Sequence, residues 1–152
     1  MSAENAAPRI VVGVDGSASS RAALRWAVVQ AKLTGSTVDA VIAWQVPTVI
    51  GSTGWAPVYV LEEGDFAEAA KKQVQRAIDE VVDSAGTQLV HAKVVKGHPA
   101  QVLLDAAAGA DLLVVGSRGH GGFADALLGS VGLYCVHHAH CPVLIVRGHP
   151  EP

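Results

Sequence analysis

The chain has 152 residues, a length that fits one domain around one hydrophobic core. Half of the residues are hydrophobic and only 16% are charged, yet no apolar run approaches the roughly 18 residues of a membrane span. The formal net charge is −3 and the lysines and arginines are scattered, which argues against a nucleic-acid-binding protein.

Residues 1–8 contain no basic region followed by an apolar stretch, so we expect a short disordered lead rather than a secretory signal. With no such signal, the two cysteines, Cys135 and Cys141, fit a reducing compartment better than a disulfide scaffold. We therefore expect a cytoplasmic protein. Its single domain is predicted to span residues 9–147, with a polar tail at residues 148–152.

The first part of the domain alternates between two kinds of hydrophobic pattern. The patterns predict a buried strand at residues 9–14, a turn at 15–17 and a helix at 22–32. They then predict a second strand at 37–46, a long loop at 47–64 and an amphipathic helix at 65–85. Ser17 or Ser19 can cap the first helix, because a hydroxyl accepts from an unpaired backbone N–H. Gly35 and Gly86 are expected to end the two helices.

The second part continues the alternation. It predicts strands at residues 88–95, 111–115 and 142–147, and helices between them at residues 97–108 and 127–138. Parallel neighbouring strands need crossovers, and helices supply them. The sequence therefore predicts an α/β protein with a five-stranded parallel sheet covered by helices on both faces.

The last strand is predicted to lie at an edge of the sheet, because Pro142 lacks a backbone N–H. An exposed apolar edge strand is a liability unless something covers it. The tail is one candidate cover. We favour the other, which is pairing with a second copy of the chain through Pro142–Arg147.

Two strand ends carry unusual residues, GVDGS at residues 13–17 and GSRG at residues 116–119. Ligands of open parallel sheets bind beyond the carboxyl ends of the strands. The glycines leave the backbone open to close approach, and Gly129-Ser130 lies where a helix begins, with unpaired N–H groups at its positive end. Arg118 is the only cation in the glycine-rich stretch. These features predict a phosphate site; the alternative is a surface loop in which Ser130 merely caps a helix.

Two known phosphate-binding motifs do not account for this stretch. A Walker loop is absent. Gly119, Gly121 and Ala124 match part of a dinucleotide fingerprint, but they follow the fourth predicted strand, and residues 139–147 contain no acid for a ribose. We interpret that match as an accident of spacing.

The pattern Gly116-x-x-Gly119, nine residues, then Gly129-Ser130 resembles the ATP-binding signature of the universal stress protein family. VVGVDGSASSRAALRWA, GHPAQVLLDAA and HHAHCPVLIVR are similar to other segments of that family, in the expected order. The resemblance implies a flavodoxin-like or Rossmann-like fold with strand order 3-2-1-4-5. It also implies homodimers formed through the last strand.

The same resemblance implies which residues would bind ATP. For the base and ribose these are Gly13, Val14, Asp15 and Ala43, and for the phosphates Gly116, Ser117, Arg118, Gly119, Gly129, Ser130 and Val131. Asp15 would also approach a phosphate-bound Mg²⁺. The family often has a serine or threonine where this chain has Gly132, so we expect weakened rather than abolished binding.

Other chemistry has less support. The segment CVHHAHC at residues 135–141 has zinc-ligand residue types, but they fall on different sides of a helix and can equally be a surface cap. Trp55 and Tyr59 of the long loop, with Trp44 nearby, can form a lid or cover a helix end. No nucleophile motif is present.

We therefore expect a stress-response sensor or regulator that binds ATP without efficient turnover, because the loop has no lysine clamp and no water-positioning residue. Two alternatives stay open. One is a protein of the same fold that binds no ATP, or another adenine nucleotide such as cyclic AMP, and acts through protein contacts. The other is a slow ATPase.

Overall fold

The structure is a computed structural model that describes residues 7–46, 63–118 and 128–148. Its elements are β1 (Arg9–Gly13), α1 (Ala18–Thr34), β2 (Thr37–Trp44), α2 (Glu63–Val81), the 3-10 helix η2 (Thr87–Leu89), β3 (Val90–Lys96), α3 (Pro99–Ala106), β4 (Leu112–Gly116), α4 (Ser130–His138) and β5 (Val143–Val146). Most of the predicted loop lies outside the described residues, including Trp55 and Tyr59.

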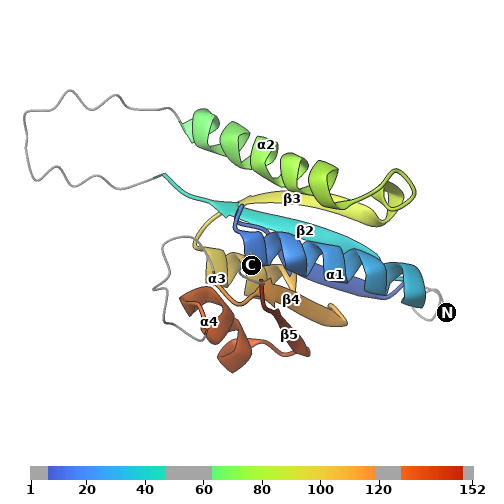
Figure 1. The fold of residues 1–152 in the computed structure, drawn as a ribbon. Helices are drawn as coiled ribbons and strands as arrows, with labels where there is room; N and C mark the ends of the chain where they lie inside the picture. Colours follow the sequence, from blue (N-terminus) through green and yellow to red (C-terminus); the bar gives the residue numbers. More distant parts are fainter. Residues whose placement is uncertain (1–6, 47–62, 119–127, 149–152) are drawn as a thin grey trace, which may run out of the picture.

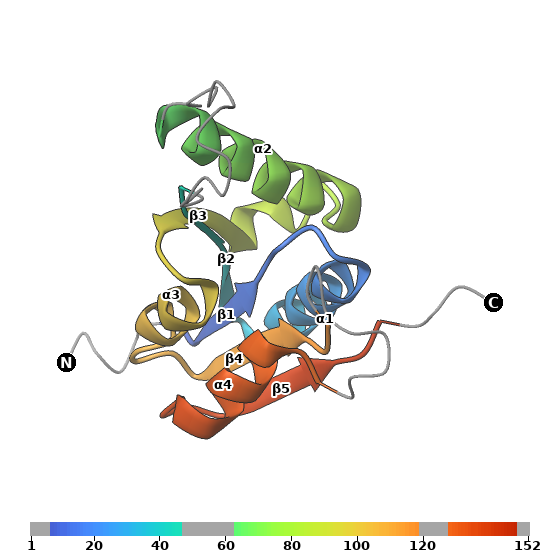
Figure 2. The same ribbon diagram turned by 90° about the vertical axis from the view of Figure 1, so that its left-hand side faces the viewer.

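All five strands form one parallel sheet in the order β3-β2-β1-β4-β5, which confirms the predicted fold and strand order. Figures 1 and 2 show the three layers: α1 and α2 cover one face of the sheet, and α3 and α4 cover the other. Within the described ranges, no helix is both long enough and apolar enough to span a bilayer.

The central strands are buried on both faces, which explains their nearly continuous apolar sequences. Successive strand residues point to opposite faces. Val12 therefore packs in the core under α1 and α2, while its neighbour Val11 packs in the core under α3 and α4, and neither is exposed. At the β5 edge, Val143–Val146 are only half-buried.

Capping places the start of α1 earlier than the apolar pattern predicted. Ser17 is the N-cap, and its Oγ accepts from the backbone N–H of Ser20 at 3.2 Å. The first turn therefore begins at Ala18, although apolar residues appear only later. Gly35 ends the helix as predicted, with φ at +72°, in the left-handed region that glycine tolerates.

Helix α2 ends at Val81, so the prediction of a helix to Ala85 stopped by Gly86 was wrong. The Asp83 carboxylate accepts from the backbone N–H of Gly86 at 2.9 Å and from Lys32 Nζ at 3.2 Å. The hydrogen bond from Lys32, followed by that from Gly86, lowers the pKa of Asp83. A side chain that binds its own backbone three residues ahead competes with the helix, which explains the early end.

Candidate functional site

A cavity of about 290 Å³ lies at the carboxyl ends of β1, β2 and β4, and residues of α3 and of the start of α4 also line it. The chain runs from β1 outward to β2 on one side and returns to β4 on the other, so this is the point where the strand order reverses. The residues that line this cavity are Gly13, Val14, Asp15, Ser20, Val41, Ala43, Pro99, Leu103, Val115, Gly116, Arg118, Gly129, Ser130, Val131 and Gly132.

The structure brings the predicted site residues together from four separate segments of the chain. All of them line the cavity except two. Ser117 is buried beside it, with only 6% of its surface exposed, and Gly119 lies outside the described residues. Residues 13–15, Ala43, the end of β4 and the start of α4 thus share one cavity, as the predicted site requires.

Ser117 joins the two halves of the glycine pattern through its backbone. Its carbonyl accepts from the N–H of Gly129 at 2.6 Å, and its own N–H donates to the carbonyl of Val146 at 2.8 Å. These bonds fix the first residue before α4 against the end of β4. We therefore interpret Ser117 as a structural junction rather than as a direct ligand contact.

The N-terminus of α4 is the strongest anion-binding feature of the cavity. Its N-cap is Gly129, and no side chain of a described residue caps the helix. Ser130 is the first helical residue, so the alternative in which Ser130 serves as an ordinary cap is wrong. Ser130, Val131 and Gly132 all line the cavity, where the unpaired N–H groups of a first turn attract negative charge.

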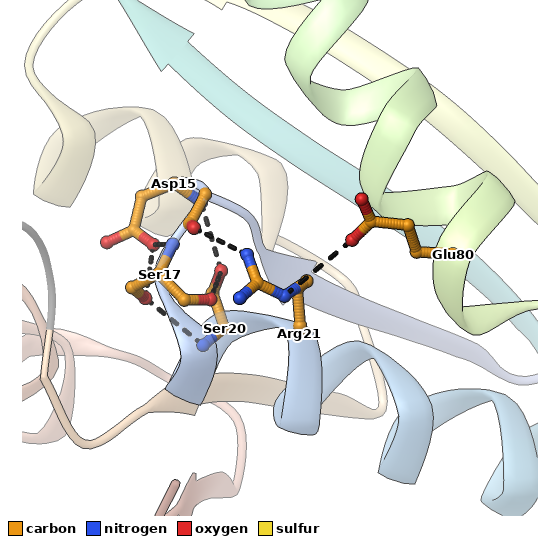
Figure 3. Close-up of polar contacts among 6 residues, drawn as sticks. Asp15, Ser17, Ser20, Arg21 and Glu80 are labelled. Atoms are coloured by element: carbon orange, nitrogen blue, oxygen red, sulfur yellow. Dashed lines mark hydrogen bonds and ion pairs between the residues drawn. The ribbon is translucent and has the colours of Figure 1, made fainter.

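The β1–α1 loop is held in shape by its own side chains (Figure 3). Asp15 Oδ1 accepts from both the N–H and the hydroxyl of Ser17, and the backbone N–H of Asp15 donates to Ser20 Oγ at 3.3 Å. Gly16 has φ at +84°, which only glycine adopts without strain. The loop therefore presents the Asp15 carboxylate in a defined orientation before any ligand arrives.

Gly116 lines the cavity and also has a packing role that the sequence did not predict. A Cβ atom at this position would lie 2.5 Å from Ser19 Oγ and 2.8 Å from the backbone nitrogen of Ser20. The first turn of α1 therefore requires a glycine here. The Ser19 hydroxyl also donates to the carbonyl of Arg118 and accepts from its N–H, so it holds the β4 end beside the β1–α1 loop.

The apolar side of the cavity was not predicted from the sequence. It is formed by Val41, Pro99, Leu103 and Val115. Val41 precedes the predicted Ala43 by two residues on β2, so strand periodicity carried a signal for it. For Leu103 the signal is three-dimensional, because its Cδ1 lies 2.8 Å from where a Cβ on Gly13 would stand.

The segment at residues 135–141 does not group its metal-ligand side chains. Across residues 7–46, 63–118 and 128–148, no three His, Cys, Asp or Glu side chains are clustered as a metal site requires. Cys135 is fully buried in the core under α3 and α4, while His137 and His138 are exposed. Burial, with a smaller contribution from Cys141, raises the pKa of Cys135 to about 11, so the thiol is neutral at physiological pH.

Comparison with known proteins gives consistent results. The sequence model of the universal stress protein family matches residues 7–147. A universal stress protein of Mycolicibacterium smegmatis is 34% identical over 140 residues, which are 91% of this chain and 48% of that protein. The chain spans about half the length of the curated relatives that it matches first.

Two solved structures illustrate the likeness in fold. Universal stress protein UspA from Lactobacillus plantarum has a TM-score of 0.69 and 24% identity, over 94% of this chain and all of that one. A universal stress protein in complex with cAMP has a TM-score of 0.59 and 29% identity, over 95% of this chain and 99% of that one.

Proposed function

The chain belongs to the universal stress protein family, and we propose that it is a cytoplasmic stress-response regulator that binds an adenine nucleotide, ATP above all. The observation that carries this proposal is a cavity lined both by the uncapped N-terminus of α4 with Arg118 and by the apolar residues Val41, Leu103 and Val115. Such a cavity suits a ligand with a flat apolar part and an anionic part.

The lining residues divide accordingly. Val41, Ala43 and Leu103 would contact the base, and the backbone N–H groups of Ser130 and Val131 would hold phosphate oxygens beside Arg118. Asp15 is the single carboxylate among the described lining residues. One carboxylate together with substrate phosphates is a common way of binding Mg²⁺.

Mg²⁺ should matter more for ATP than for a nucleotide with one phosphate. The described lining has one positively charged side chain, that of Arg118, and one negatively charged side chain, that of Asp15, so the two charges offset each other. The helix end adds only about half a positive charge. A triphosphate brings several negative charges, so we expect Mg²⁺ to tighten ATP binding and to affect cyclic AMP binding little.

We propose binding without efficient turnover. The described lining contains no lysine, and Asp15 Oδ1 already accepts hydrogen bonds from the N–H and the hydroxyl of Ser17. Hydrolysis of bound ATP faster than about 1 s⁻¹, the low end of ordinary enzyme rates, would contradict this and make the protein an ATPase.

Calorimetric titration with ATP, AMP and cyclic AMP, each with and without Mg²⁺, tests the proposal together with a phosphate-release assay. Mass spectrometry of the purified protein would show whether a nucleotide is retained. A protein that binds none of the three would overturn the proposal and favour action through protein contacts.

The same protein is proposed to form a homodimer through β5. This strand lies at the edge of the sheet, its side chains are half-buried, and within the described residues it pairs only with β4. Sedimentation equilibrium should give twice the chain mass. A single-chain mass at every concentration would contradict the dimer without affecting the nucleotide site.

A further inference from the structure

We propose that Gln73 of α2 is a positioning residue for the nucleotide site, and that through it α2 and nucleotide binding influence each other. The inference rests on the proposed function, since it names a control on the same cavity. Gln73 does not line that cavity; it acts on the loop that does.

The contact is a hydrogen bond between segments far apart in the sequence. Gln73 Nε2 donates to the backbone carbonyl of Asp15 at 3.0 Å, and Gln73 is half-buried. A carbonyl oxygen can only accept, so the amide nitrogen must face it and the orientation of the side chain is unambiguous. The residue held in this way, Asp15, is one of those that line the cavity.

A second tether holds the next carbonyl along the loop. Arg21 Nη1 donates to the carbonyl of Gly16 at 2.7 Å, and Arg21 Nε lies 3.8 Å from Glu80 Oε2 of α2 (Figure 3). Two successive carbonyls of the β1–α1 loop are thus held, one by α2 directly and one through an α1 side chain that α2 contacts.

The described residues around the loop on its α2 side are mainly polar. A small cavity of about 90 Å³ lies beside the loop between α1 and α2, lined by Gly16, Arg21, Gln73, Arg76, Ala77 and Glu80. Most of these side chains are polar. On this side, the hydrogen bonds to the loop carbonyls therefore add to the bonds from Asp15 to Ser17 and Ser20 in fixing the position of Asp15.

Helix α2 is suited to respond to such a contact. Four of its 19 residues are buried, Ala70, Val74, Ala77 and Ile78, which pack on the β2–β3 side of the sheet. Coupling between two events is reciprocal in free energy. If the Gln73 bond favours the loop position that binds nucleotide, then bound nucleotide must stabilise the docking of α2.

Gln73→Ala and Gln73→Glu test the contact, with Gln75→Ala and Gln75→Glu as matched controls. Gln75 lies on the same helix but is exposed, and its amide donates to Asp79 of that helix. We expect Gln73→Ala to weaken nucleotide binding about three- to tenfold, the loss of one ordinary hydrogen bond. Gln73→Glu should weaken it at least as much, because a carboxylate would face a carbonyl oxygen. The Gln75 variants should stay within about twofold of wild type.

Hydrogen exchange supplies a readout that a purely structural role would not move. Nucleotide should slow amide exchange along α2 in the wild type and in the Gln75 variants, but not in Gln73→Ala. Equal affinities for Gln73→Ala and Gln75→Ala, or equal protection of α2, overturn this inference and leave the proposed function standing. If the wild type binds no nucleotide, the proposed function fails. In that case, amide hydrogen exchange at Gly16 and Ser17 in the ligand-free protein tests whether Gln73 positions the β1–α1 loop. This exchange should be faster in Gln73→Ala than in Gln75→Ala.

Discussion

Gly116 packs so closely against Ser19 that any side chain at position 116 would force the backbone of α1 or β4 to shift. A Cβ atom there would lie 2.5 Å from Ser19 Oγ and 2.7 Å from the carbonyl carbon of the same residue. The second contact is with backbone, so no change of rotamer relieves it. Part of the glycine signature therefore exists because α1 begins directly against the end of β4.

Gly116→Ala should accordingly destabilise the fold by about 1–3 kcal/mol, the usual cost of overpacking. Gly64→Ala is the control, because Gly64 lies in the first turn of α2 and a Cβ there meets no atom of the described residues within 4 Å. That change should be neutral or slightly stabilising. Urea unfolding measures both. A midpoint for Gly116→Ala equal to that of Gly64→Ala would show that α1 can move away.

Gly129→Asp should abolish nucleotide binding while the fold survives. Gly129 has φ −67° and ψ 161°, which any residue adopts, and aspartate is a favoured N-cap. The new carboxylate would repel phosphate at the helix end, so we expect affinity to fall at least about tenfold, or 1.4 kcal/mol. Gly129→Asn, of the same size without the charge, should lose less. Unchanged ATP affinity in Gly129→Asp would remove α4 from the site.

Gly132→Ser tests the missing hydroxyl. A Cβ on Gly132 would lie 3.0 Å from Leu128 Cδ1, the end of a side chain that can shift. The added hydroxyl gives the phosphates another donor, so we expect Gly132→Ser to bind ATP about two- to tenfold more tightly than Gly132→Ala. The alanine variant carries the same steric change and the same gain in helix propensity. Equal affinities for the two variants would mean that the hydroxyl does not reach the phosphates.

Cys135 should make stability depend on alkaline pH. Burial raises its pKa from 9.0 to about 11 in the folded protein, so between these values the folded state keeps a proton that the unfolded chain releases. The free energy of unfolding therefore falls as the pH rises through this window, by up to about 2–3 kcal/mol. Cys135→Ala should lack this component, although it is less stable overall. Urea unfolding from pH 8 to pH 11 measures both, and parallel pH profiles would contradict the assignment.

Local patterns in the sequence predicted most of the elements. Alternating apolar runs indicated the strands and α-helices that the structure describes, though not the 3-10 helix η2, and the resemblance to the family supplied the strand order that the structure confirms. Errors concentrated at element ends. The start of α1 depends on the Ser17 cap and the end of α2 on Asp83, and in both places a polar side chain binding the backbone overrides the apolar pattern.

By itself, the sequence determined that glycines, a serine and one arginine stand at strand and helix ends, where backbone N–H groups are unpaired. Only the tertiary structure decided what each of them does. It gave Gly116 a packing role and Ser117 a junction role, and it also brought Gln73, which no pattern had singled out, into contact with Asp15. The physical reason is range: periodicity and capping act within a few residues, whereas the shape of a cavity depends on side chains that meet from distant parts of the chain.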